Sequence, residues 1–113
     1  MMDEVVYRHV ETLDSKLHSY GVQLTLDGEP LNRAEVMCSV YESDQVNPDV
    51  KYPVLILADD QGVLHVGRTM LNYELLFLKI RHPKLKRDVT LSFSPPVPPR
   101  LHLALHSLHI KEP

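Results

Sequence analysis

Three histidines near the C-terminus have a spacing that could support metal chemistry. His102, His106 and His109 lie within one eight-residue segment. In an α-helix, spacings of four and three place side chains on one face. Imidazole nitrogens are common ligands of zinc. The pattern therefore indicates a candidate site for a divalent metal, and the sequence indicates no other cofactor.

The same segment can also be interpreted as a strand. Leu101, Leu103 and Leu105 alternate along it and would point into a core. His102 and His106 would then share the outer face, and the third histidine would lie on the opposite face. We favour the strand because the leucines alternate regularly and a proline-rich stretch precedes them. In this geometry the histidines would face solvent, with a pH-responsive surface as a further alternative.

A basic cluster between two predicted strands is the second candidate site. Its cationic groups could bind a partner, but exposed Lys and Arg side chains also keep sheet edges soluble. A solvated rim is the simpler interpretation, and partner binding is the functional alternative. The candidate partner-binding residues are Arg81, His82, Lys84, Lys86 and Arg87.

The remaining reactive side chains do not form a catalytic motif. Cys38 is the single cysteine and lies on an alternating face, which predicts a small buried hydrophobe. Asp59 and Asp60 precede Gly62, but no later acid completes a calcium-loop spacing, so we interpret them as turn residues. There is no phosphate-binding glycine loop and no nucleophile elbow. We therefore assign no catalytic residue and favour a protein that is not an enzyme.

Composition and charge narrow the partners. The chain has 113 residues and a formal net charge of −3, which is unlike an electrostatic nucleic-acid binder. Its longest apolar run, around residues 75–78, is far shorter than the roughly 20 residues that span a bilayer. The first twenty residues do not have the pattern of a signal peptide. We expect no nucleic acid and no membrane insertion, and a cytoplasmic location if the chain is complete.

Alternation of apolar and polar residues predicts an all-β fold. A proline-rich connector at residues 95–99 precedes the last predicted strand, and a polar loop at about residues 43–52 separates two others. The run at 54–58 is continuously apolar, which favours a central strand, and the turn at 59–62 predicts that 63–66 returns as its hairpin partner. The other predicted strands are residues 22–26, 34–40, 72–81, 89–93 and 101–105.

The N-terminal segment has a different spacing. Val6, Val10, Leu13 and Leu17 are separated by four, three and four residues, which is typical of a helix. The alternative is that residues 5–7 begin an edge strand. We therefore divide the chain into an N-terminal helical or edge segment, 1–20, and a single β-sandwich domain, 21–113.

The predicted strands and turns resemble a known family. LTLDGEPLNRAEV at residues 24–36 is similar to the opening of transthyretin-like and carboxypeptidase-regulatory-like domains, and ADDQGVL at 58–64 occupies the place of their threonine, aspartate, glycine turn. LFLKIRHP at 76–83, followed by KRDVTL at 86–91, resembles their late hairpin. The resemblance implies an immunoglobulin-like or prealbumin-like antiparallel sandwich of about seven strands, serving as a non-catalytic module.

Two classes of function follow from these observations. Some members of that superfamily hydrolyse a urate breakdown product and end in Tyr-Arg-Gly-Ser, but this chain ends in His-Ile-Lys-Glu-Pro, so no catalytic residue is carried over. We favour a protein-binding or assembly module that presents an edge strand, the polar loop or the basic turn to another protein. A homodimer through an edge strand is one such arrangement. The alternative is a metal-binding or hydrolytic protein that uses the C-terminal histidines.

Overall fold

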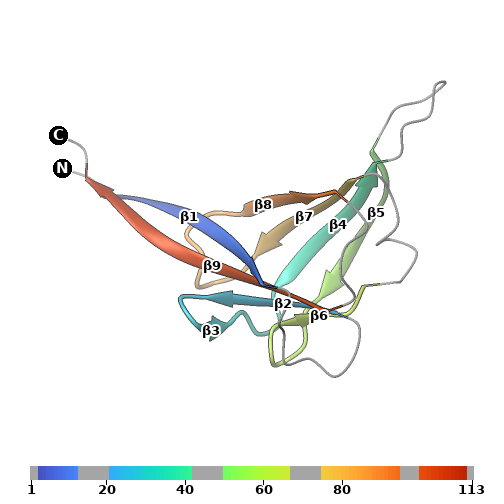
Figure 1. Cartoon of the computed structure of the whole chain (residues 1–113), viewed down its shortest axis with the longest axis horizontal. Coiled ribbons are helices and arrows are strands. Elements are labelled where there is room, and N and C mark those ends of the chain that lie inside the picture. Colours follow the sequence, from blue (N-terminus) through green and yellow to red (C-terminus); the bar gives the residue numbers. More distant parts are fainter. Residues whose placement is uncertain (1–2, 13–20, 42–49, 67–74, 95–99, 112–113) are drawn as a thin grey trace.

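Strands make up all the regular structure that is described. The computed structural model describes residues 3–12, 21–41, 50–66, 75–94 and 100–111. Seven strands have five or more residues and two have only two (Figure 1). They are β1 (Asp3–Thr12), β2 (Gly21–Leu26), β3 (Glu29–Pro30), β4 (Glu35–Tyr41), β5 (Val50–Leu57), β6 (Val63–Leu64), β7 (Leu75–Arg81), β8 (Val89–Phe93) and β9 (Arg100–Lys111).

The strands form two sheets that pack around one core. One sheet has the order β1-β9-β2-β3, with β6 also paired to β2, and the other has the order β5-β4-β7-β8 (Figure 1). Every pair is antiparallel except β2 with β9, which is parallel. The buried cluster draws on both sheets. The predicted all-β sandwich is therefore confirmed, and no helix in the described ranges is long and apolar enough to cross a membrane.

The core consists of the inward side chains of alternating strands. Successive residues of a strand point to opposite faces, so a period of two buries one set and exposes the other. This alternation was predicted for β2, β4, β8 and the first half of β9, and the burial pattern confirms it for the last three. In β2 it holds from Val22 to Leu24, but Thr25 is buried and Leu26 is only half-buried. The fully buried large side chains include Leu24, Val36, Val40, Leu76, Leu78, Ile80, Leu101, Leu103 and Leu105.

The N-terminal segment is an edge strand, which was the second of the two alternatives. β1 pairs with β9 from Asp3 opposite Lys111 to Thr12 opposite His102. The helical interpretation is wrong for residues 3–12 because a spacing of four is also even. Val6 and Val10 therefore share a face in a strand as they would in a helix. Residues 13–20, which supplied the rest of the helical pattern, lie outside the described ranges, as do residues 42–49 of the polar loop.

Two expectations about β5 need correction. The segment after the 59–62 turn does not return beside it, because β6 pairs with β2 in the other sheet. β5 is also at the edge of its sheet, where β4 is its paired neighbour among the described strands. The turn itself has the predicted chemistry: the Asp59 carboxylate accepts hydrogen bonds from Gln61 N at 2.8 Å and Val63 N at 2.9 Å. The turn therefore links the two sheets rather than two neighbouring strands.

Candidate functional site

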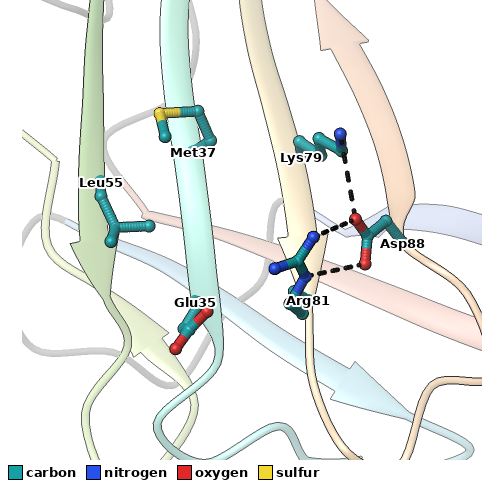
Figure 2. Close-up of a pocket in the computed structure, with 6 residues that line it drawn as sticks. All are labelled: Glu35, Met37, Leu55, Lys79, Arg81 and Asp88. Carbon is teal, nitrogen blue, oxygen red and sulfur yellow. Dashed lines mark hydrogen bonds and ion pairs between the residues drawn. The ribbon is translucent and has the colours of Figure 1, made fainter.

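A small hollow lies on the outer face of the four-stranded sheet. Its position follows from register, because Met37 of β4 pairs with Leu55 of β5 on one side and with Lys79 of β7 on the other. These side chains point away from the core, since their neighbours on β4 point inward. Figure 2 shows them across three adjacent strands. The residues that line the hollow are Glu35, Met37, Leu55, Lys79, Arg81 and Asp88.

The floor of this hollow is apolar and accessible. Met37 is 40% exposed, Leu55 is 56% exposed, and the neighbouring Leu57 is 61% exposed. The hollow has a volume of about 180 Å³, which is below the roughly 300–1,000 Å³ typical of small-molecule pockets.

Charged groups form one border of the hollow. Arg81 donates two hydrogen bonds to Asp88, Nε to Oδ1 at 3.2 Å and Nη2 to Oδ2 at 3.1 Å, and Lys79 Nζ lies 3.9 Å from Asp88 Oδ2 (Figure 2). The hydrogen bond from Arg81 holds the pKa of the Asp88 carboxyl below its usual value, and the same contact raises the pKa of Arg81. The border therefore keeps its charges at neutral pH.

The hollow is lined by two acidic, two basic and two apolar residues. Cys38 is adjacent in sequence but buried on the core side of β4, and burial raises the pKa of its thiol to about 11. The thiol is therefore protonated at neutral pH and is a poor nucleophile.

The three C-terminal histidines lie on a strand, as favoured, and do not share a face. β9 pairs with β1 without a register shift, so His102 and His106 alternate to one face and His109 to the other. His102 Nε2 lies 2.8 Å from Thr25 Oγ1, and burial lowers the pKa of the His102 ring. Among the side chains that the structure describes, no group of three His, Cys, Asp or Glu residues is placed to hold a metal ion.

Asp27 directly follows the last residue of β2 and lies beside His106. Its carboxylate accepts hydrogen bonds from Ser107 N at 3.0 Å and from Ser107 Oγ, and it lies 4.0 Å from His106 Nδ1. The hydroxyl hydrogen bond from Ser107 is the main cause of a lowered Asp27 pKa. Asp27 thus attaches the end of β2 to β9 just where their backbone pairing stops.

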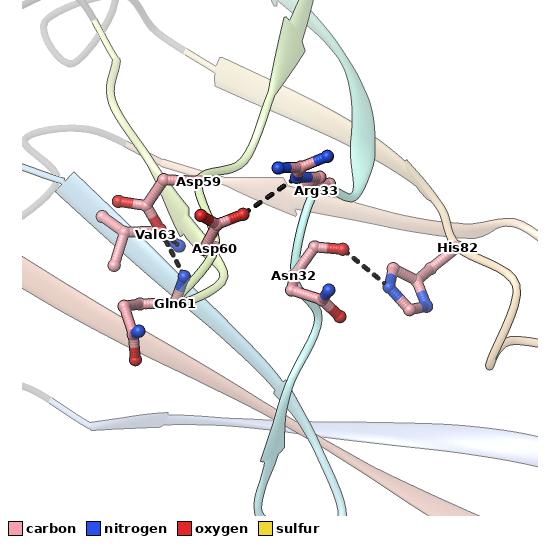
Figure 3. Close-up of polar contacts among 7 residues, drawn as sticks. All are labelled: Asn32, Arg33, Asp59, Asp60, Gln61, Val63 and His82. Atoms are coloured by element: carbon pink, nitrogen blue, oxygen red, sulfur yellow. Dashed lines mark hydrogen bonds and ion pairs between the residues drawn. The ribbon is translucent and has the colours of Figure 1, made fainter.

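The predicted basic cluster is divided between two sides of the β7–β8 connection. Arg81 belongs to the outer-face hollow, whereas His82 is buried. His82 Nε2 lies 2.9 Å from Asn32 O (Figure 3). Its Nδ1 accepts a hydrogen bond from Lys84 N at 3.0 Å. His82 therefore holds the connection against the loop before β4 and is not presented to a partner.

The rest of the cluster supports β1. Lys86 N donates a hydrogen bond to Tyr7 Oη at 2.8 Å, and the Arg87 guanidinium donates to Val5 O. Lys84 and Lys86 are both exposed. Of the five residues predicted to bind a partner, His82 is buried and only Arg81 lines the hollow.

Sequence reasoning did not find the apolar part of the candidate site. Met37 and Leu57 are apolar residues at outward positions of β4 and β5, and the signal for them was an apolar run with no polar partner at every second position. A continuous apolar run is equally typical of a strand buried on both sides. Only the strand order shows that β5 is an edge strand with an exposed outer face.

Comparison with known proteins adds no assignment to this geometry. No family model matches the chain, and neither a curated protein nor a solved structure matches it.

Proposed function

We propose that this protein is a non-catalytic protein-binding or assembly module that docks its partner on the outer face of the four-stranded sheet. The observation that carries the proposal is the exposed apolar floor formed by Met37 and Leu55, with exposed Leu57 next to it, beside the Arg81 and Asp88 ion pair. Apolar surface bordered by charge is typical of protein interfaces. The resemblance of the strands and turns to transthyretin-like domains supports the same class of module.

The expected mode of binding is insertion of one partner side chain into the hollow. An apolar side chain would contact Met37 and Leu55 and be shielded from water by the charged border. Such central, desolvated contacts usually provide most of the affinity of an interface. Exchanging Leu55 for Lys should therefore weaken partner binding about tenfold or more, because it places a charge in the centre of the contact.

Site-specific photocrosslinking tests this surface. A photoreactive residue at position 37 should give a discrete crosslinked product in a lysate of the native cells, and excess unlabelled wild-type protein should suppress it. Excess Leu55→Lys protein should suppress it much less. The matched control carries the same photoreactive residue in place of Thr90. This is an exposed, outward position on β8 that lies outside the hollow. Equal labelling from positions 37 and 90 would contradict the proposal.

A further inference from the structure

We infer that β5 pairs antiparallel with β5 of a second copy of this chain, about a two-fold axis at Leu55. The two four-stranded sheets would then join into one continuous sheet. The inference rests on the proposed function, since the added strand would extend the outer face that carries Met37 and Leu55. Its basis is the exposed apolar edge of β5 and its self-complementary, uncharged sequence.

The last residues of β5 form an apolar edge. Sheet edges are normally protected by charged residues, prolines, bulges, short length or a covering element. In β5 the lysine, the proline and a register shift against β4 all lie in the first half of the strand, whereas Val54, Leu55 and Leu57 at its end are exposed apolar residues. The other edges differ: β3 and β6 have two residues each, β8 carries exposed Thr90 and Ser92, and β1 carries exposed Arg8, His9 and Glu11. Among the described edges, β5 is therefore the one suited to adding a strand.

A two-fold axis at Leu55 matches apolar residues on both faces of the new pair. On the outer face, Leu55 meets Leu55 of the second copy, and Pro53 meets Leu57. On the inner face, Val54 meets Ile56. A two-fold interface must be complementary to itself, and the segment PVLIL at residues 53–57 fulfils this condition at every position. The row of Met37 and Leu55 would also continue into the same row of the second copy.

The lack of charge in this segment favours a second copy in this register. Residues 53–58 contain no charged residue, so two copies meet without like-charge repulsion. Pro53 has no N–H to donate and limits the ladder to a short segment. We therefore expect a weak dimer whose population depends on concentration.

Cysteine crosslinking tests both the dimer and its register. In this arrangement the two thiols of the Leu55→Cys variant face each other across the axis, within the reach of a disulfide. The two thiols of the Leu57→Cys variant would lie four positions apart, roughly 13 Å, which is too far. Mild oxidation should link Leu55→Cys into dimers at least tenfold faster than Leu57→Cys, although both positions are exposed. The native Cys38 is buried and protonated, so it does not compete.

Sedimentation of unmodified variants provides the second readout. Wild-type protein should shift from monomer to dimer with rising concentration. Leu55→Lys should lower the association constant at least tenfold, because two ammonium groups meet on the axis. Thr90→Lys adds the same charge to the same face and should leave the association unchanged. Circular dichroism and thermal melting of each variant confirm that it is folded.

The outcomes separate this inference from the proposed function. A wild-type monomer at every concentration, or equal crosslinking rates for Leu55→Cys and Leu57→Cys, would overturn the β5 dimer. The photoreactive residue at position 37 could nevertheless capture a different protein, with the capture suppressed by excess wild-type protein and not by excess Leu55→Lys protein. In that case the binding module would stand without the dimer. If position 37 captured nothing specific and the chain stayed monomeric, both would be wrong.

Discussion

At the scale of single residues, His82 makes the most demanding contact. Its ring donates through Nε2 to Asn32 O and accepts through Nδ1 from Lys84 N, so both nitrogens of the neutral imidazole are used. We expect His82→Ala to lower the free energy of unfolding by about 1–3 kcal/mol, because the buried polar groups lose their partner. Urea denaturation measures this loss.

A second histidine provides the control for His82. His109 is exposed on β9, and exposed substitutions usually change stability by less than about 0.5 kcal/mol. Equal losses for His82→Ala and His109→Ala would show that the His82 hydrogen bonds do not stabilise the fold.

Asp27 should make the free energy of unfolding depend on pH in the acid range. Its hydrogen bonds from Ser107 lower the Asp27 pKa below 3.8, so its contribution to stability is fully present at neutral pH. The contribution is lost as pH falls below 3.8 through the lowered pKa of the folded state. Asp27→Asn should therefore be less stable than wild type at pH 7, and the difference should shrink as the pH falls below 3.8.

A double-mutant cycle isolates the Asp27 contact. Ser107→Ala removes the hydroxyl donor and should reduce the same pH dependence. Combining it with Asp27→Asn should add little, since both changes remove one interaction. Urea denaturation across the pH range measures the free energy of unfolding of each variant. Fully additive losses of stability would assign the acid sensitivity to other carboxylates.

At the scale of elements, two turn glycines differ in what surrounds them. Both have positive φ, 88° at Gly28 and 75° at Gly62, but a Cβ at Gly62 would lie 2.6 Å from Leu24 O and 2.9 Å from Leu31 N. No atom lies within 4 Å of a Cβ at Gly28. Gly28→Ala should cost about 1–2 kcal/mol from backbone strain alone. Gly62→Ala should cost clearly more, because backbone must move.

Thermal melting of the two glycine variants tests this order. The pair is well matched because the substitution and the sign of φ are the same. A Gly28→Ala variant as unstable as Gly62→Ala would mean that the crowding around Gly62 is relieved without cost.

The elements also show how far the sequence alone could lead. Strict alternation in β4 and β8 predicted their faces correctly, because burial of one face is what selects that pattern. In β2 the same pattern failed at Thr25, which is buried. The even spacing of Val6 and Val10 fits two periods, so it could not distinguish a strand from a helix. Nothing local in the two residues of β6 indicates that they cross to the other sheet. Pairing partners are set by the whole core, which short segments do not report.

The candidate site was even less accessible to sequence reasoning. The histidines and the basic turn attracted attention because their residue types are chemically distinctive. Met37, Leu55 and Lys79 are ordinary residues that lie far apart in the chain. They meet only because β4 pairs with β5 and β7 in one particular register.

At the scale of the whole molecule, β9 joins the two ends of the chain. It lies between β1 and β2, antiparallel to one and parallel to the other. Beyond Leu105 it continues as a ribbon with β1 alone, and this ribbon extends from the body of the molecule (Figure 1). Asp27 and the β7–β8 connection are held to the ribbon by hydrogen bonds, Asp27 to Ser107 of β9 and Lys86 to Tyr7 of β1.

This central position of β9 has a consequence during synthesis. Thr12 and His102, which contact each other, are 90 positions apart. At roughly 5–20 residues per second, the ribosome needs on the order of ten seconds to make the intervening chain. Throughout that interval β1 and β2 have no central strand to pair with, and the apolar faces of the nascent chain stay open to chaperones. The first sheet can close only after its last strand has emerged.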